Sequence, residues 1–293
     1  PAAQARVLIG GEIRTWDGTK RDVVSPLWLR PAADAAPTPT ILGQTPHLTA
    51  DVALEALAAA RSAWAQGAGP WPTLRVEARI EAVERFLAAM VAVRDRVCRL
   101  LMWEVGKTWP DAQSEFDRTV QYLRDTVEAL KTQDRDNSRL QFREGVIAQV
   151  RRAPLGVTLC MGPFNYPLNE TFATLIPALI MGNTAVVKLP RSGVLLWDPL
   201  LEAFRDAFPA GVVNIINGQG SEIVPPLMQS GHVDVLAFIG SSKAADAIKG
   251  AHPRLHRLRC ILGLDAKNPA VILPDTDLAA AITALPAVQV QKG

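Results

Sequence analysis

The chain has 293 residues, of which 48% are hydrophobic and 20% are charged, so its composition is that of an ordinary globular protein with enough apolar material for one large or two smaller domains. Its net charge of +2 gives no electrostatic reason to expect a nucleic-acid partner or a membrane surface, and the longest apolar stretch, Thr171–Ile180, is too short to span a bilayer. Three cysteines without C-x-x-C spacing argue against a zinc site and a disulfide framework, and they predict a cytoplasmic protein.

The N-terminal part is predicted to be an arm followed by helices. The first fifty residues are rich in Pro, Ala and Thr, which indicates an extended arm over a core rather than a part of the core. Apolar residues at helical spacing then predict three helices, one beginning after Thr49 as N-cap, a long one over residues 73–106 and one over residues 110–134. Two alternating runs about Glu144-Gly145 predict a β-ribbon.

From residue 156 onward, short apolar strands alternate with helical stretches. The predicted strands cover residues 156–162, 184–190, 211–218, 235–240 and 259–264. The predicted helices are Leu168–Met181, Val194–Phe208, Ser221–Gln229 and Ser242–Gly250. This alternation predicts an α/β fold with a Rossmann-like, doubly wound parallel sheet whose strands are covered on both faces. Cys160 and Cys260 lie inside strands, so both are expected to be inert core thiols.

In such a sheet, ligands bind at the carboxyl ends of the strands. The candidate residues at these ends are Pro163, Phe164, Asn165, Lys188, Pro190, Arg191, Gly218, Gly240, Ser241 and Asp265. Glycine and serine at a strand-to-helix turn expose N–H groups beside a positive helix end, which suits a phosphate. With Lys188 and Arg191 nearby, the turns favour a dinucleotide. Taken alone, a capped α/β loop without a ligand is an equal alternative.

Four stretches together carry a resemblance to a known family. "MGPFNYPLNETFATLIPALIMGNTAVVKLP", "FPAGVVNIINGQG", "FIGSS" and "KNPAVILPDTDL" resemble the aldehyde dehydrogenase superfamily in order and spacing, over about Val7 to Ala280. The wording "LPRSGVLLWDPLLEAFRDAFPAGVVNIINGQG" is most similar to the NADP-dependent, non-phosphorylating glyceraldehyde-3-phosphate dehydrogenase branch. The resemblance implies a cofactor-binding domain made of an arm and helices (1–133), an oligomerisation-type ribbon (134–154) and a dinucleotide-binding core (155–264), followed by the start of a catalytic domain (265–293).

The resemblance also implies roles for the strand-end residues. Asn165 corresponds to the family's oxyanion-hole asparagine, the alternative being an asparagine in a proline-flanked turn. Lys188 corresponds to the lysine that contacts the adenosine ribose and phosphate. Arg191 stands where many NAD-preferring members have a glutamate, which favours NADP over NAD; a solvated loop charge is the alternative. The remaining residues implied to line the cofactor are Pro163, Phe164, Pro190, Gly218, Gly240 and Ser241.

Two departures from the family pattern limit the expected activity. The family's general-base glutamate is replaced by Gly263, and we hypothesise that Asp265, on the same face of the strand, takes its place. The nucleophilic cysteine of the family lies downstream of the last motif, and the sequence ends before any such segment. We therefore expect a truncated chain that binds a dinucleotide and, without a catalytic domain, oxidises no aldehyde.

Three alternatives remain open for this chain. It is the cofactor-binding portion of an aldehyde dehydrogenase, with glyceraldehyde 3-phosphate as one candidate substrate, or a non-catalytic dinucleotide-binding or interaction protein on a truncated dehydrogenase fold, or a fragment of a larger enzyme. A homo-oligomer is compatible with each of them.

Overall fold

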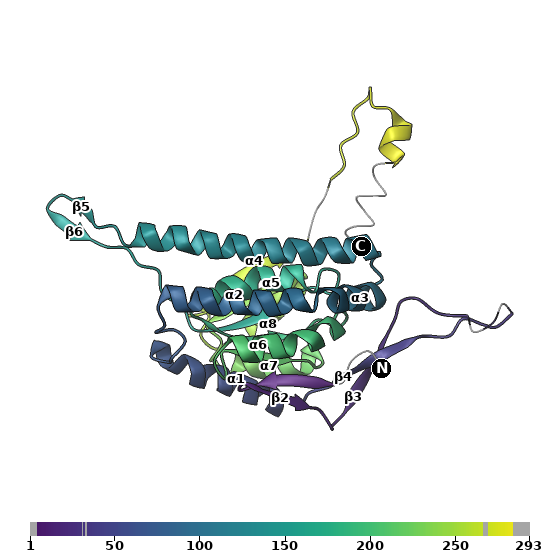
Figure 1. The fold of residues 1–293 in the computed structure, drawn as a ribbon, viewed down its shortest axis with the longest axis horizontal. Helices are drawn as coiled ribbons and strands as arrows, with labels where there is room; N and C mark the ends of the chain where they lie inside the picture. Colours follow the sequence, from purple (N-terminus) through teal and green to yellow (C-terminus); the bar gives the residue numbers. More distant parts are fainter. Residues whose placement is uncertain (1–4, 31, 33, 266–268, 284–293) are drawn as a thin grey trace.

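The computed structural model describes residues 5–30, 32, 34–265 and 269–283, and a seven-stranded sheet forms its centre (Figure 1). Parallel strands stand in the order β11-β10-β7-β8-β9, and the antiparallel strands β1 and β2 extend the sheet beyond β9. The strands are β1 (Arg6–Ile9), β2 (Glu12–Thr15), β7 (Val157–Met161), β8 (Thr184–Lys188), β9 (Val213–Ile216), β10 (Val235–Gly240) and β11 (Arg259–Leu264). The expected α/β fold with a parallel core is confirmed.

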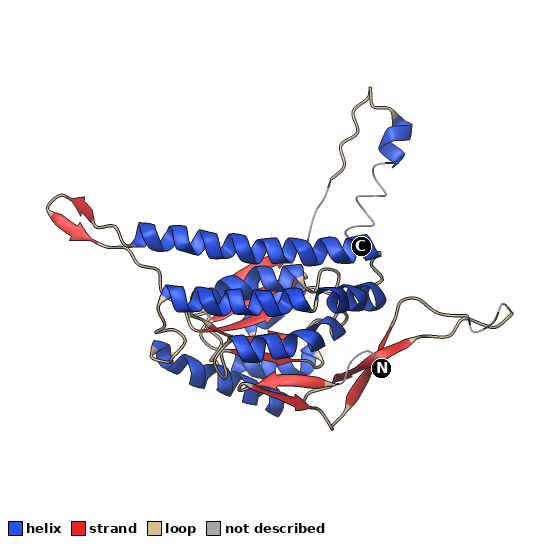
Figure 2. Ribbon diagram, viewed as in Figure 1, coloured by secondary structure: helices blue, strands red, loops and turns tan. Residues whose placement is uncertain are grey.

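Helices cover both faces of the sheet (Figure 2). One face carries α1 (Ala50–Trp64), α7 (Gly220–Gln229) and α8 (Ser242–Gly250). The other carries α2 (Val76–Ala92), α3 (Arg94–Val105), α4 (Trp109–Asn137), α5 (Asn169–Ile180), the 3-10 turn η2 (Leu195–Leu200) and α6 (Leu201–Ala207). Side chains along a strand alternate between the two cores, so that Leu159 packs on the first face and Cys160 on the second. This two-sided burial explains why the inner strands are apolar throughout.

The N-terminal segment corrects one prediction, because part of it belongs to the core. Val7, Leu8 and Ile9 are at most 2% exposed, and Leu8 pairs with Ile215 of β9. The run Arg6–Ile9 is strand-like in sequence, but four residues do not reveal whether a strand pairs with the main sheet or lies in an arm. The rest of the segment fits the predicted arm better, since β3 (Lys20–Val24) and β4 (Ile41–Pro46) form a separate ribbon that projects from the body (Figure 1).

Two of the predicted helices are interrupted. The helix expected over residues 73–106 is divided into α2 and α3 at Val93, whose N–H donates to the Met90 carbonyl in a tighter turn. The stretch Val194–Phe208 begins as the 3-10 turn η2 and continues as α6. Pro199 lies in η2 and has no N–H to donate, which favours the irregular start.

The predicted β-ribbon is present and exposed. β5 (Gln141–Arg143) and β6 (Val146–Ala148) pair about Glu144 and Gly145, which both have positive φ, as a two-residue hairpin turn requires. Phe142 on this ribbon is 71% exposed. The division of the chain into domains at these boundaries stays a prediction.

The opposite edge of the sheet corrects the expectation for Cys260. This residue lies in β11, as predicted, but its side chain is exposed. β11 is an edge strand that pairs only with β10 among the described residues, and residues 269–280 beyond it are exposed as well. None of the helices in the described ranges combines the length and the apolar character needed to cross a membrane.

Candidate functional site

The strand order brings the predicted site residues to one edge of the sheet. The chain moves outward from β7 through β8 to β9 and then returns to the other side of β7 with β10. In a doubly wound sheet, this reversal opens a crevice at the carboxyl ends of the strands where the direction changes. The turns after β7, β8, β9 and β10 therefore face a common region, and they contain every predicted site residue except Asp265, which follows β11.

The turn after β7 is fixed by hydrogen bonds to a side chain of α4. The buried Glu115 accepts hydrogen bonds from the backbone N–H groups of Leu168 (3.0 Å) and Asn169 (3.1 Å), and its other oxygen lies 2.6 Å from the Lys107 ammonium. That ammonium also lies 3.5 Å from the centre of the Tyr166 ring, a cation–π contact.

The three predicted residues of this turn are therefore presented on a fixed loop. Asn165 is half-buried, and its side-chain amide forms no hydrogen bond with the described residues. Pro163 is half-buried as well, and Phe164 is 59% exposed. An amide in this position keeps its N–H donors available for a ligand.

Lys188, at the end of β8, is a buried residue whose ammonium has no compensating charge in the part of the chain that the structure describes. It is 8% exposed, and within the described part of the chain its ammonium has no ion pair or hydrogen bond. Burial, and then the charge of Arg21, lower the pKa of Lys188 to about 8. A β-carbon at Gly220 would lie only 3.6 Å from the ammonium nitrogen, so the start of α7 passes close to it. An ammonium in these surroundings is stabilised by an anion.

The turn after β9 leaves little room for a side chain at position 218. The Asn217 amide nitrogen donates to the Thr45 hydroxyl, and its carbonyl oxygen accepts from the Gly218 N–H at 3.0 Å. The Asn217 backbone carbonyl accepts from Leu48, and a β-carbon at Gly218 would lie 3.0 Å from the Leu48 carbonyl oxygen. The turn is thus fixed against β4 and leads directly into the N-terminus of α7.

The turn after β10 begins α8, with Ser241 as its N-cap. The Ser241 hydroxyl accepts a hydrogen bond from the Ala244 N–H at 3.3 Å. Asp265 reaches the same helix end, since its carboxylate accepts from the Ser242 N–H (3.0 Å) and the Ser242 hydroxyl (2.6 Å). Lys267 and Asn268 of the same motif lie outside the described residues.

An apolar cleft lies between α7 and α8 next to these turns. Its volume is about 450 Å³, which suits a planar apolar ring. It is lined by Met161, Gly220, Ser221, Val224, Pro225, Phe238, Ala244, Ala247, Ile248 and Ala251. The cleft therefore joins the turn beside Lys188 to the strands β7 and β10.

A second cavity, of about 470 Å³, lies beside the loop after β8 and contains a residue that sequence reasoning missed. Its lining includes Arg191, which is exposed, and Arg21 from β3. Pro190 is buried behind them. A lone arginine on a short strand carries no motif, and the pairing of β3 with this loop depends on tertiary structure. No sequence signal would have found Arg21.

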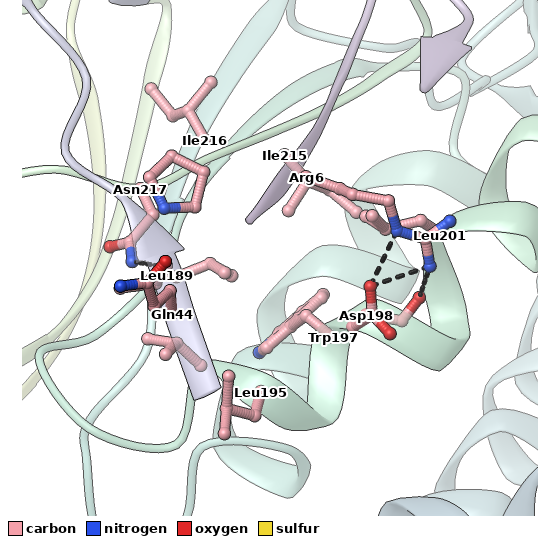
Figure 3. A pocket seen from close by; sticks show the side chains of 13 residues that line it. Arg6, Gln44, Leu189, Leu195, Trp197, Asp198, Leu201, Ile215, Ile216 and Asn217 are labelled. Carbon is pink, nitrogen blue, oxygen red and sulfur yellow. Dashed lines mark hydrogen bonds and ion pairs between the residues drawn. The ribbon is translucent and has the colours of Figure 1, made fainter. Parts of the chain in front are cut away.

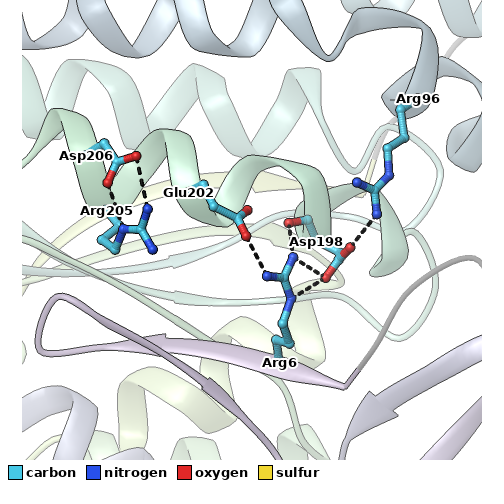
Figure 4. Close-up of polar contacts among 6 residues, drawn as sticks. All are labelled: Arg6, Arg96, Asp198, Glu202, Arg205 and Asp206. Carbon is cyan, nitrogen blue, oxygen red and sulfur yellow. Dashed lines mark hydrogen bonds and ion pairs between the residues drawn. The ribbon is translucent and has the colours of Figure 1, made fainter.

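A third cavity, between β1, β9 and η2, is too small for a ligand. Its volume is about 20 Å³, and Leu195, Trp197 and Asn217 are among the side chains that line it (Figure 3). Beside it, Arg6 contacts Asp198 at 2.7 Å and Glu202 at 2.5 Å, and Arg96 contacts Asp198 at 2.8 Å (Figure 4). This polar cluster ties β1 and α3 to η2.

Within the described ranges, no cluster of three or more His, Cys, Asp or Glu residues could hold a metal ion.

Comparisons with known proteins identify the family. Residues 31–290 match the profile of the aldehyde dehydrogenase family. The NADP-dependent glyceraldehyde-3-phosphate dehydrogenase of Streptococcus equinus is 31% identical over 223 residues, which cover 71% of this chain and 44% of that protein. Malonate-semialdehyde dehydrogenase 2 of Geobacillus thermodenitrificans is 29% identical over 248 residues, covering 84% and 50%.

The fold agrees with this match. The crystal structure of NADP-dependent glyceraldehyde-3-phosphate dehydrogenase from Bacillus halodurans, complexed with NADP, superimposes with a TM-score of 0.80 at 27% identity, over 97% of this chain and 57% of that one. The chain spans about half the length of the curated relatives it matches. The family profile and the fold comparison agree, and the chain belongs to the aldehyde dehydrogenase family.

Proposed function

We propose that this chain binds NADP, and NAD less tightly, as the cofactor-binding part of an aldehyde dehydrogenase. The observation that carries the proposal is Lys188, a buried residue at the carboxyl edge of the sheet whose ammonium has no counter-charge among the described residues. Proteins rarely retain such a group unless a ligand neutralises it.

Each part of the dinucleotide has a matching environment. The apolar cleft between α7 and α8 suits the adenine ring, and Lys188 with the turn at Gly218 suits the adenosine ribose and its phosphate. The N–H groups at Gly240 and Ser241 suit the pyrophosphate. Pro163 and Phe164 lie along the nicotinamide side. Arg191 suits the 2′-phosphate of NADP, and proteins named as NADP-dependent are among the matched relatives and structures.

The proposed reaction is the oxidation of a small aldehyde to the acid. Bound NADP would supply the hydride acceptor. Asn165 would donate a hydrogen bond to the oxygen that becomes negative when a nucleophile adds to the aldehyde carbonyl. Glyceraldehyde 3-phosphate is a candidate substrate because two matched dehydrogenases carry that name, one of them over 97% of this chain in structure. In sequence, malonate-semialdehyde dehydrogenase 2 matches over 84% of the chain, against 71% for the glyceraldehyde-3-phosphate dehydrogenase of Streptococcus equinus.

Asp265 stays a hypothesis for the general base. Its Oδ2 accepts two hydrogen bonds from Ser242, which hold the carboxylate against the start of α8. In a chain that carries the nucleophile, Asp265→Ala should slow deacylation if the hypothesis holds.

In the same chain, Asn165→Ala is expected to lower kcat about 100-fold and to leave the Kd for NADP unchanged.

The binding proposal is tested by calorimetric titration of the chain with NADP and with NAD. We expect saturable binding of both, tighter for NADP, and a loss of at least about tenfold in affinity for both in Lys188→Gln. Arg143→Gln on the exposed ribbon is the matched control and should bind as the unchanged chain does. If neither nucleotide binds the unchanged chain saturably, the proposal is wrong.

A non-catalytic interaction protein is the second candidate. The exposed apolar side chains of the β5–β6 ribbon, such as Phe142 and Ile147, support association with a further chain or a second copy.

We also propose a cytoplasmic location, for which the free thiols Cys98, Cys160 and Cys260 are the support.

A further inference from the structure

Three positive charges meet at one place near the end of β8. The Arg21 guanidinium donates a hydrogen bond of 2.6 Å to the backbone carbonyl of Arg191, so it lies on the loop that carries the second arginine. Lys188 begins the same loop, and the charge of Arg21 contributes to its lowered pKa. Burial, and then the charge of Arg191, lower the pKa of Arg21 as well. Bringing like charges together raises the free energy of the folded state.

The neighbouring carboxylates compensate for this charge only in part. Glu104 is 2% exposed. Its carboxylate oxygens accept hydrogen bonds of 2.7 to 2.9 Å from the backbone N–H groups at the start of η2, which belong to Gly193, Val194 and Leu195. Asp22 accepts a hydrogen bond of 2.9 Å from Gln44. In the described part of the chain, no ion pair joins either carboxylate to Arg21 or Arg191.

Both arginines face an open space. Arg21 and Arg191 line the same cavity of about 470 Å³ together with Phe164 and Ser192, and the lining also contains Asp22 and Glu104. Guanidinium groups bind phosphate oxygens in pairs of parallel hydrogen bonds, and a phosphomonoester carries nearly two negative charges at neutral pH. The cavity therefore has paired donors and the volume to receive a phosphomonoester.

We propose that Arg21 determines cofactor specificity by binding, together with Arg191, the 2′-phosphate that NADP has and NAD lacks. The inference rests on the proposed function, because it assumes that the adenosine ribose lies against Lys188. Its new element is the origin of the second arginine: Arg21 comes from the N-terminal ribbon of β3 and β4, about 170 residues before the loop it contacts. The ribbon thereby becomes part of the cofactor site.

The test compares Arg21→Gln, Arg21→Lys and the control Arg143→Gln by titration with NADP and with NAD at two ionic strengths. We expect Arg21→Gln to weaken NADP binding about tenfold and to change NAD binding less than about twofold. Arg21→Lys keeps the charge and should lose less. The salt dependence of NADP binding should also be weaker in Arg21→Gln, since one fewer cation faces the phosphate.

The outcomes separate this inference from the proposed function. Equal losses for NADP and NAD in both Arg21 variants would mean that Arg21 only supports the loop, and an unchanged NADP-to-NAD ratio would likewise overturn the inference while the cofactor site stands. Stronger competition by 2′,5′-ADP than by 5′-AMP, with the difference reduced in Arg21→Gln, would support it independently. If the unchanged chain binds neither nucleotide, the proposed function fails, and the inference fails with it.

Discussion

Lys188 is the residue at which binding and stability oppose each other. Lys188 is 8% exposed at the end of β8, and its ammonium, close to the start of α7, has no counter-ion in the described part of the chain. Burial, and then the charge of Arg21, lower its pKa to about 8, so the folded state disfavours the charged form. A group that a bound anion stabilises is costly when no anion is present.

The replacement Lys188→Met should therefore stabilise the chain while it removes dinucleotide binding. At pH 7 we expect the free energy of unfolding to rise by about 1 to 3 kcal/mol, because a buried charge is exchanged for an apolar side chain of similar length. Urea unfolding followed by circular dichroism measures the change. A loss of stability would show that the ammonium has a structural partner.

The same residue predicts a pH dependence. Between pH 8 and 10.5 the Lys188 ammonium keeps its proton in the unfolded chain and has lost it in the folded chain. Unfolding therefore takes up a proton in this pH range. The contribution of Lys188 to the free energy of unfolding consequently becomes more favourable as the pH rises from 8 to 10.5. The difference in unfolding free energy between the unchanged chain and Lys188→Met isolates this contribution. We expect that difference to shrink as the pH rises from 8 to 10.5, and a constant difference would contradict the lowered pKa.

At the scale of elements, β1 is held in the sheet by more than its own hydrogen bonds. Arg6 contacts both Asp198 of η2 and Glu202 of α6, and Asp198 is only 8% exposed (Figure 4). Burial raises the pKa of Asp198 although Arg6 acts against the rise. The short strand and the irregular turn thus depend on a partly buried ion pair.

Arg6→Met should consequently destabilise the fold by about 1 to 3 kcal/mol, since Asp198 keeps only Arg96 as a partner. Thermal and urea unfolding measure the effect. The matched control is Arg205→Gln, which breaks the exposed pair with Asp206 (2.7 Å) and should leave the unfolding midpoint unchanged. Equal effects of the two replacements would show that burial of the pair contributes nothing.

Most of these elements could be predicted because their local pattern and their tertiary role agree. The strands β7 to β10 are apolar runs between turns, and their burial on two faces is what an apolar run indicates. The break between α2 and α3 was not predictable, because Val93 is flanked by apolar residues at helical spacing and no Gly or Pro marks the interruption.

The candidate site was predictable to the same extent. Turns at strand ends follow from the alternation of strands and helices, so Lys188, Gly218 and Ser241 could be placed together in advance. Arg21 could not, because it reaches the site through a ribbon whose position only the folded chain defines. The prediction that Cys260 is buried was wrong, because an edge strand and an inner strand can have the same apolar sequence.

For the whole molecule, the three cysteines can be used to test the packing of the core and of the sheet edge separately. Burial raises the pKa of Cys98 to about 11 and that of Cys160 to about 12, whereas Cys260 is exposed on β11. An aromatic disulfide reagent should therefore modify one thiol per folded chain rapidly and all three after unfolding in urea. Cys260→Ser should remove the rapid reaction; rapid loss of two or three thiols would contradict the described packing.

The pairing of β1 with β9 has a consequence for synthesis on the ribosome. Residues 6–9 leave the ribosome long before β9, which ends at Ile216, about 200 residues later. At ordinary elongation rates this interval lasts roughly 10 to 40 s, during which β1 can pair with β2 but not with β9. A nascent chain stalled before β9 should expose its N-terminal segment to protease, and the segment should become protected only once that strand has emerged.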